Sequence, residues 1–480
     1  MNWLTTLNES QLKAVVHPGG PLFVVAGAGT GKTKTLTSRI AYLIMEGVDP
    51  RHILAVTFTN KAAREMKQRV VDMTGPHAMS VWLYTFHAFG LQILRRHIAE
   101  LPYGYRPNFT VIDEDDGKKI VQESIKALGL DTKMFSIKAL KNLISLYKSR
   151  RMDGFERTDE EKIYQKYQDY LKENQLVDFD DLLLYTLELF EGYPEVRTRY
   201  QTYFEYILVD EFQDTDQIQY KVLQLLGKVH KNVFVVGDPD QSIYAFRGAK
   251  YENAQNFIKD FGAEQIILEQ NYRSTNHILK AANQLIQYNM NRPAAKNLES
   301  NLGSGEYPIY HHAQNDYRET FFVVNEIQRL KSLGISYDEM AVLYRNNALS
   351  RLFEDALIKA GVPYIIYGGI SFYERKEIKD ALAYIRVVLD SNQDFFLKRI
   401  INVPKRSIGL VSLQKLELRA RELGVSMFEA IDYVQVTPSA KKSMLEFKAL
   451  ITDMKQGFGD MVDLEQIMPY LMGKTGYIDM

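Results

Sequence analysis

The stretch LFVVAGAGTGKT, residues 22–33, decides the expected fold because an apolar run leads directly into a glycine-rich turn. Residues 22–26 are wholly apolar, as in a central strand of a parallel sheet. The turn at 26–33 then opens a long helical pattern that extends to Met45. Strand, turn and helix in this order are the setting of a phosphate-binding P-loop, although Ala26 stands where the general pattern has its first glycine.

The chemistry expected at this turn follows from its backbone and its last side chains. Glycines let the backbone N–H groups converge on a phosphate, backed by the dipole of the following helix. The residues that would hold the phosphates in this way are Ala28, Gly29, Thr30, Gly31, Lys32, Thr33 and Lys34. Lys32 would reach the β- and γ-phosphates, and the Thr33 hydroxyl would ligate Mg²⁺. The alternative is a glycine-rich turn with a solvated lysine; we predict an ATP and Mg²⁺ site.

Short apolar runs alternate with helical patterns, which predicts an α/β fold with a parallel sheet. The runs are Leu22–Ala26, Ile53–Phe58, Tyr206–Val209, Val233–Val236 and Gln265–Leu268. Between about Asp113 and Tyr203 the strands stop, and lysine- and tyrosine-rich helical patterns indicate an inserted helical domain. A second α/β segment is expected to follow, with strands near Tyr307–His311, Met340–Tyr344 and Tyr364–Tyr367. From Glu374 onward the pattern is helical again.

Composition narrows the class of protein without identifying it. The 59 basic and 60 acidic side chains give a net charge of -1, so any polyanion-binding surface must be a local stripe. The absence of cysteine excludes disulfides, thiolate metal sites and cysteine nucleophiles, and a reducing cytosol suits such a chain. No signal peptide and no apolar window long enough to span a membrane are evident. We expect a cytoplasmic protein of roughly three domains.

Two acids follow the apolar run 206–209, in the order Asp210 and Glu211. A buried strand should not end in paired carboxylates unless their charge is compensated, and Mg²⁺·ATP would supply that compensation. Asp210 would hold the metal, and Glu211 would orient and deprotonate the attacking water. The alternative is a strand that leads into a surface turn, which is the more frequent meaning of such a pair in isolation.

Two later segments add polar residues at the ends of apolar runs. Val233–Val236 leads into a loop in which Gln241 is placed to sense the γ-phosphate. Tyr244 and Phe246 in the same loop could offer ring faces to unpaired bases, or could fill the core instead. After the run at 265–268, Arg273 is a candidate arginine finger, although an isolated arginine there is usually a surface salt-bridge partner.

These segments together closely resemble the UvrD/PcrA/Rep group of superfamily 1 DNA helicases, over nearly all of the chain. Besides 26–33, the matching segments are 7–11, 55–66, 84–87, 178–182, 210–215, 237–248, 270–275, 341–347, 368–378 and 401–409. The resemblance implies RecA-like P-loop parallel-sheet domains with inserted all-helical domains. It places domain 1A at 1–112 and 204–276, 1B at 113–203, part of 2A at 277–374 and part of 2B at 375–480.

The resemblance also implies roles for individual residues. Gln11 would read the adenine, and Tyr272 would stack on it while Arg273 meets the γ-phosphate. The residues implied to contact DNA are Phe58, Asn60, His87, Tyr244, Phe246, Arg247, Arg345 and Asn347. The family usually has tryptophan at Phe246, so a smaller ring face remains for stacking. The segment 401–409 resembles a hairpin that grips duplex phosphates, with Ser407 in place of a usual glycine.

The family's motifs V and VI do not occur in the sequence, so we expect a C-terminally truncated member that lacks half of the second RecA-like domain and its arginine finger. The leading hypothesis is a monomeric 3′→5′ DNA helicase that acts at single-strand/duplex junctions in repair or replication. A helicase–nuclease subunit is an alternative. The sequence shows no additional cluster of nuclease residues, which argues against this alternative. A second alternative is a catalytically incomplete DNA-binding fragment without autonomous unwinding.

Overall fold

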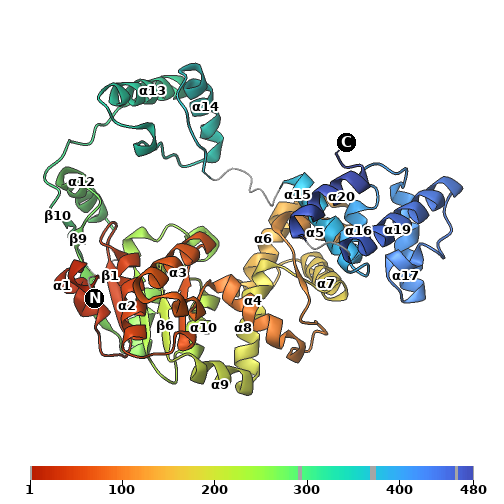
Figure 1. The fold of residues 1–480 in the computed structure, drawn as a ribbon, viewed down its shortest axis with the longest axis horizontal. Coiled ribbons are helices and arrows are strands. Elements are labelled where there is room, and N and C mark those ends of the chain that lie inside the picture. The colour runs from red at the N-terminus through yellow and green to blue at the C-terminus, as the bar shows by residue number, and fades with distance from the viewer. Residues whose placement is uncertain (1–2, 290–294, 368–374, 460–462, 479–480) are drawn as a thin grey trace. The chain divides into compact units, whose positions relative to one another are not determined.

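A computed structural model describes residues 3–289, 295–367, 375–459 and 463–478 of the chain. The chain forms two units, Met1–Pro308 and Ile309–Met480. In Figure 1 the first unit runs from red to green and holds the large sheet, and the second runs from teal to blue and is helical. Among the described helices, none combines the length and the apolar character that a membrane span requires.

Six parallel strands form the sheet of the first unit, in the order β3-β2-β6-β7-β1-β8. Their bounds are β1 (Leu22–Ala26), β2 (Ile53–Thr57), β3 (Trp82–Thr85), β6 (Tyr206–Val209), β7 (Val233–Gly237) and β8 (Glu264–Leu268). In the register, Val24 of β1 lies opposite Val236 of β7 and Ile266 of β8. The strand that precedes the P-loop is therefore paired on both sides, as its uniform apolar sequence predicts.

Apolar cores cover both faces of the sheet because alternate residues of a strand point to opposite faces. On one face Val24 and Phe234 pack with helices α2 (Lys32–Met45) and α3 (Asn60–Thr74). On the other face Phe23 and Val235 belong to a core to which α9 (Pro194–Tyr203) and four further helices contribute. The four further helices are α4 (Phe86–His97), α8 (Phe179–Gly192), α10 (Gln217–Leu226) and α11 (Asn253–Phe261). The parallel-sheet prediction is confirmed.

The helical segment between residues 113 and 203 contains α5 (Glu114–Ala127), α6 (Ile137–Lys148), α7 (Thr158–Glu173), α8 and α9 (Pro194–Tyr203). It is not wholly helical, because β5 (Leu176–Val177) pairs in parallel with β4 (Thr110–Val111). α8 supplies core residues to the face of the sheet and also contacts α6. This shared helix ties the segment to the sheet.

The first unit ends with a short extension beyond β8. β9 (Gln270–Asn271) pairs in parallel with β10 (Glu299–Ser300), and α12 (Asn276–Ile286) lies between them in the sequence. The Asn276 amide donates to the Ser300 carbonyl at 2.8 Å and thereby holds α12 to β10. Within this extension, Asn271 and Tyr272 lie next to the P-loop and form hydrogen bonds with Ala28 and Gly29.

The described residues of the second unit form a small and a larger apolar core. A small core joins α13 (Asp316–Ser332) to α14 (Ser350–Lys359) through Val324 and Leu357. A larger core joins six helices, which are α15 (Lys376–Leu389), α16 (Asp394–Ile400), α17 (Leu410–Leu423), α18 (Met427–Ala430), α19 (Pro438–Gly459) and α20 (Ile467–Thr475). The helical prediction for the C-terminal part is confirmed over its described residues.

The three strands predicted in residues 307–367 are wrong. Residues 307–311, 340–344 and 364–367 form no strand, and side chains such as Ile309, Leu343 and Ile365 are exposed there. A strand requires a hydrogen-bonded neighbour for its backbone, and none of these runs pairs with another within the described part of the chain. Their apolar, β-branched composition alone could not reveal whether a pairing partner is present.

Candidate functional site

The P-loop turns between β1 and α2, whose first residue is Lys32. Gly29 and Gly31 have φ angles of 69° and 86°, in the left-handed region. The Thr30 amide and hydroxyl both donate to the Gly27 carbonyl, at 3.3 and 2.8 Å. The loop thus ends with its N–H groups at the N-terminus of a 14-residue helix, which is an arrangement that binds phosphate.

Hydrogen bonds from two distant segments hold the loop in place. The buried Gln11 amide donates to the Thr30 carbonyl at 2.9 Å, from α1 (Glu9–Val15). On the other side, the Asn271 amide donates to the Ala28 carbonyl at 2.6 Å, and the Tyr272 N–H donates to Gly29 at 2.9 Å. The loop is therefore preorganised by the segments around Gln11 and Tyr272, the two residues predicted to contact adenine.

Gly29 gives a direct test of this preorganisation. A Cβ at Gly29 would lie 2.7 Å from both Arg273 Cβ and Asn271 Nδ2, in addition to the strain of a positive φ. We expect Gly29→Ala to displace the loop and to weaken MgATP binding about 5- to 30-fold, from a cost of about 1–2 kcal/mol. Isothermal titration calorimetry measures this change.

Gly47→Ala is the matched control for Gly29→Ala. Gly47 also has a positive φ, of 93°, but a Cβ there meets nothing within 4 Å. It therefore carries the same kind of backbone strain without the close contacts. Equal MgATP affinities in the two variants would contradict the role of close packing around the P-loop.

Lys32 and Glu211 meet across the carboxyl ends of β1 and β6. Lys32 Nζ lies 3.5 Å from Glu211 Oε2, and the lysine side chain is only 10% exposed. Glu211 has a φ of 50°, a left-handed conformation that residues with a side chain adopt uncommonly. The two side chains predicted to hold the γ-phosphate and to activate water are thus brought together.

Asp210 is buried beside this pair and has the character of a metal ligand. Burial, and then the charge of Glu211, raise the pKa of Asp210 to about 7, while Lys32 opposes the shift. Its Oδ1 atom has no hydrogen-bond partner among the described residues. A buried carboxylate with a spare oxygen suits Mg²⁺, which prefers oxygen ligands and keeps several waters. Thr33 offers a hydroxyl in the first turn of α2, which follows β1, and β1 is separated from β6 in the sheet by β7 alone.

Gln213 links the two strand ends, and sequence reasoning missed it. Its amide donates to Glu211 Oε2 at 2.8 Å, and its side-chain carbonyl accepts the Asp238 N–H at 2.8 Å. Glu211 follows β6 and Asp238 follows β7, so a single buried side chain connects Glu211 to the next loop. Its position within the segment 210–215, which resembles the helicase family, could have identified Gln213 as a site residue.

Gln241, the predicted γ-phosphate sensor, lies in the loop after β7. Its amide donates to Asp238 of the same loop. Lys296 forms ion pairs with Asp238 and with Asp240, and the lysine side chain is 4% exposed. The loop at 238–241 is therefore fixed from both sides, by Gln213 and by Lys296. The sensing role of Gln241 remains a prediction.

The remaining predicted nucleotide residues surround the P-loop. Tyr272 is half exposed, and its hydroxyl accepts from the Asn8 amide at 2.8 Å. Arg273 is exposed next to Gly29, with its backbone N–H bonded to Asn271 Oδ1 at 2.8 Å. The ammonium of Lys34 donates to the Thr6 carbonyl at 2.7 Å, so it ties α2 to the N-terminal segment.

An aromatic cluster lies at the same edge of the sheet. Ring centroids are 4.8 Å apart between Phe58 and Tyr244 and 5.9 Å apart between Tyr244 and Phe246. The Arg247 guanidinium lies 5.2 Å from the Tyr244 ring centroid. Phe58 is 37% exposed. Phe246 is 66% exposed, so its ring does not fill the core as the alternative for Tyr244 and Phe246 proposed, and Tyr244 is partly buried. The predicted base-contacting residues form one accessible surface.

The cluster and the carboxylates line one continuous groove of about 740 Å³. Its lining includes Asp210 and Glu211 as well as Phe58, Tyr244 and Phe246. His87 also lines the groove, and burial lowers its pKa while Asp180 opposes the shift. Asn60, at the start of α3, accepts the Thr85 hydroxyl hydrogen bond at 3.4 Å. The groove thus joins the carboxylate site to the aromatic surface.

Comparison with known proteins assigns the family. The UvrD/REP helicase N-terminal domain matches residues 7–262, which is more than half of the chain, and the UvrD-like helicase C-terminal domain matches residues 266–458. The chain belongs to the UvrD/REP helicase family. The C-terminal match ends at residue 458, and the matches do not confirm the predicted truncation.

Similar members of the UvrD/REP family come from staphylococci. The chain is 42% identical to the ATP-dependent DNA helicase PcrA of Staphylococcus epidermidis over 490 residues, which cover 99% of this chain and 66% of that protein. It is also 42% identical to the ATP-dependent DNA helicase PcrA of Staphylococcus aureus over 493 residues, covering 99% and 67% of the two. The chain therefore spans about two thirds of the length of the curated relatives that it matches.

Other predicted family segments lie in the second unit. Arg345 and Asn347 are exposed near the short helix η10 (Asn347–Leu349), and their predicted DNA contacts remain predictions. Most of the segment 368–378 lies outside the described residues. In 401–409, Ser407 has a φ of 59°, so the serine adopts a left-handed conformation that favours the glycine usual in the family.

Proposed function

We propose that the chain is the ATP-driven motor part of a 3′→5′ DNA helicase that moves along single-stranded DNA at a junction with duplex. The observation that carries the proposal is the groove in which carboxylates and exposed aromatic rings share one lining. A motor must couple the state of its nucleotide to its grip on the strand. Here Gln213 joins Glu211 to the loop that begins at Asp238 and continues to Tyr244.

Each residue then has a chemical task. The P-loop amides and Lys32 bind the phosphates. Thr33 and Asp210 would hold Mg²⁺, which would neutralise charge on the phosphates. Glu211 accepts a proton from the attacking water, and Arg273 stabilises charge on the transferred phosphoryl group. Gln11 and Tyr272 bind the base. Adenine stacking on Tyr272 is compatible with its exposed ring.

On the DNA side, unpaired bases stack on Phe58, Tyr244 and Phe246, since ring faces accept any base. Arg247 and His87 contact the backbone of the strand. A role in repair or replication, in the cytoplasm and as a monomer, follows from the resemblance to the family. The direction of movement and the preference for a junction have the same basis.

Single-stranded DNA is expected to stimulate ATP hydrolysis by the chain, and Phe58→Ala tests this coupling. Because stacking on one ring contributes about 1–3 kcal/mol, the DNA concentration for half-maximal stimulation should rise about 5- to 150-fold. Hydrolysis without DNA should be unchanged. The measurement is phosphate release against oligo(dT) concentration. DNA binding without ATP turnover would instead support an incomplete DNA-binding fragment, and failure to bind either ligand would exclude the motor.

A further inference from the structure

The groove has a second wall that no sequence motif identified, and it is formed by α6 of the helical segment. The groove-lining residues of this helix and of its C-cap are Asn142, Ser145, Leu146 and Ser149. Their spacing of three and four residues places them on one helical face. The opposite face is buried, and it carries Leu140, Lys141, Ile144 and Lys148. α6 therefore presents a polar face to the groove and anchors itself with the other face.

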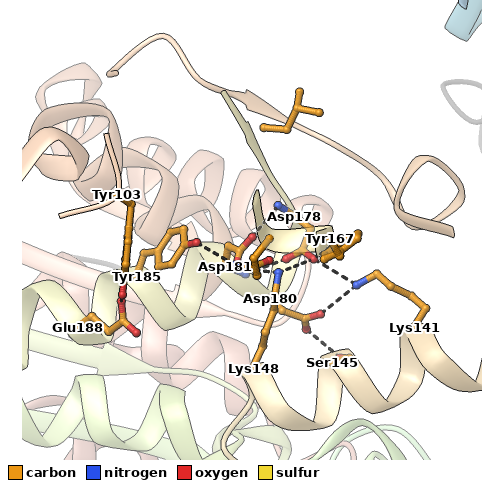
Figure 2. Close-up of polar contacts among 12 residues, drawn as sticks. Tyr103, Lys141, Ser145, Lys148, Tyr167, Asp178, Asp180, Asp181, Tyr185 and Glu188 are labelled. Atoms are coloured by element: carbon orange, nitrogen blue, oxygen red, sulfur yellow. Dashed lines mark hydrogen bonds and ion pairs between the residues drawn. The ribbon is translucent and has the colours of Figure 1, made fainter. Parts of the chain in front are cut away.

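The anchor is a cluster of buried charges between α6 and the start of α8, shown in Figure 2. Lys148 Nζ lies 2.9 Å from Asp178 Oδ2 and 2.8 Å from Asp181 Oδ1, and its side chain is fully buried. The Tyr167 hydroxyl donates to Asp178 at 2.8 Å, and Lys141 lies 3.2 Å from the same carboxylate. These bonds fix the rotation of α6 and hence the face that it turns to the groove.

The charges of the cluster are consistent with a rigid anchor. Burial disfavours the charged form of Lys148, but Asp178 and Asp181 outweigh that effect and leave its pKa raised. Burial also opposes ionisation of Asp178, but Lys148 and Lys141 hold its pKa well below the usual range. The Lys148–Asp178 pair is thus ionised within the core. Such a pair is held by its geometry and does not exchange freely with water.

Arg151, just after α6, reaches across to the aromatic loop. Its Nη2 lies 3.5 Å from the Ala245 carbonyl oxygen. A Cβ at Gly248 would lie 3.2 Å from Arg151 Cδ and Nη1, so the side chain lies directly against that glycine. Ala245 and Gly248 bracket Phe246 and Arg247. Arg151 therefore packs on the loop that carries Phe246 and Arg247, both of which line the groove.

We propose that α6 is the second wall of the single-strand groove, in which Asn142 contacts the DNA strand and Arg151 positions the aromatic loop. The inference rests on the proposed function. Asn142 is exposed to the groove and has no hydrogen-bond partner among the described residues. Its amide both donates and accepts, as contact with base edges or sugars requires. Arg151 keeps Tyr244 and Phe246 where bases can stack.

The test measures binding of fluorescein-labelled oligo(dT) by anisotropy over a series of salt concentrations. Asn142→Ala should weaken binding about 2- to 10-fold, as expected for one hydrogen bond. Arg151→Ala should weaken it at least about 5-fold, because a displaced ring loses its stacking. Arg151→Lys keeps the charge but not the planar contact, and it should remain weak. MgATP affinity should be unchanged in all three variants.

Salt dependence separates positioning by Arg151 from direct phosphate binding. A lost phosphate contact lowers the slope of log K against log salt by about 1. A displaced loop lowers affinity with no change of slope. Lys138→Ala is the control, since it removes one positive charge from an exposed position of the same helix outside the groove. It should bind oligo(dT) as the unmodified chain does.

The outcomes distinguish this inference from the proposed function. If the unmodified chain binds oligo(dT) and Phe58→Ala weakens binding, but Asn142→Ala and Arg151→Ala do not, the second wall is overturned and the motor remains. If Arg151→Ala lowers the salt slope, its positioning role is overturned. If the unmodified chain does not bind oligo(dT) at micromolar protein, the proposed function itself fails.

Discussion

Replacing Glu211 with glutamine is expected to lower kcat for DNA-stimulated ATP hydrolysis about 10²- to 10⁴-fold, because the amide cannot accept the proton of the attacking water. The change keeps the size of the side chain and leaves Gln213 a partner at the same position. MgATP binding should be retained. The substitution removes a negative charge next to Lys32, so the lysine keeps its full attraction for the phosphates. Steady-state phosphate release and calorimetric MgATP binding measure the two quantities.

Glu205→Gln is the control for this prediction. Glu205 immediately precedes β6, at the opposite end of the same strand, and pairs with His52 at 2.8 Å. Loss of its charge should leave kcat unchanged. If Glu211→Gln hydrolysed ATP at the normal rate, the assignment of Glu211 as the general base would be wrong, and another group would have to orient the water.

Replacing Lys148 with methionine is expected to lower the local stability of α6 and α8 by about 3–5 kcal/mol, because it leaves buried carboxylates without their partner. Lys148 is the only described cation within ion-pair distance of Asp181, while Asp178 retains Lys141. Amide hydrogen exchange followed by mass spectrometry measures the opening of the two helices directly. Oligo(dT) binding should weaken as well, since α6 forms part of the groove.

Two further variants separate charge from packing at Lys148. Burial, and then the charge of Asp178, raise the pKa of Asp181 to about 7. Adding Asp181→Asn to Lys148→Met replaces this buried carboxyl group, which has lost its lysine partner, with a neutral amide and should restore part of the protection. Lys162→Met removes an exposed lysine whose distance to Asp159 is 3.5 Å, and it should cost at most about 1 kcal/mol. Normal exchange rates in Lys148→Met would show that the buried pairs do not hold α6 in place.

Much of the first unit could be predicted because its signals are local. A uniformly apolar run before a glycine-rich turn specifies a central parallel strand. The turn itself, residues 26–33, ends in Lys32 and Thr33 and so identifies them as candidate phosphate and metal ligands. Asp210 and Glu211 could be placed at the same edge because parallel strands end together. The strand order then brought Lys32 to within 3.5 Å of Glu211.

The sequence failed to predict features that depend on contacts with residues distant in the chain. The apolar runs at 307–311, 340–344 and 364–367 have the composition of strands, yet they have no paired neighbour among the described residues. The lysine-rich pattern of this segment indicated an inserted helical domain, but it did not indicate that Lys148 of α6 is fully buried. Its burial depends on two carboxylates 30 or more residues away, and helical periodicity carries no information about them.

By itself, the sequence determined the P-loop, the two acids after β6, the parallel sheet and the family, because each depends on short-range order along the chain. Only the tertiary structure decided how these parts work together. It placed Gln213 between two strand ends, buried Lys148 against Asp178 and Asp181, and set Arg151 against Gly248. Each of these contacts joins distant segments, and its stability comes from burial and geometry that exist only after the chain has folded.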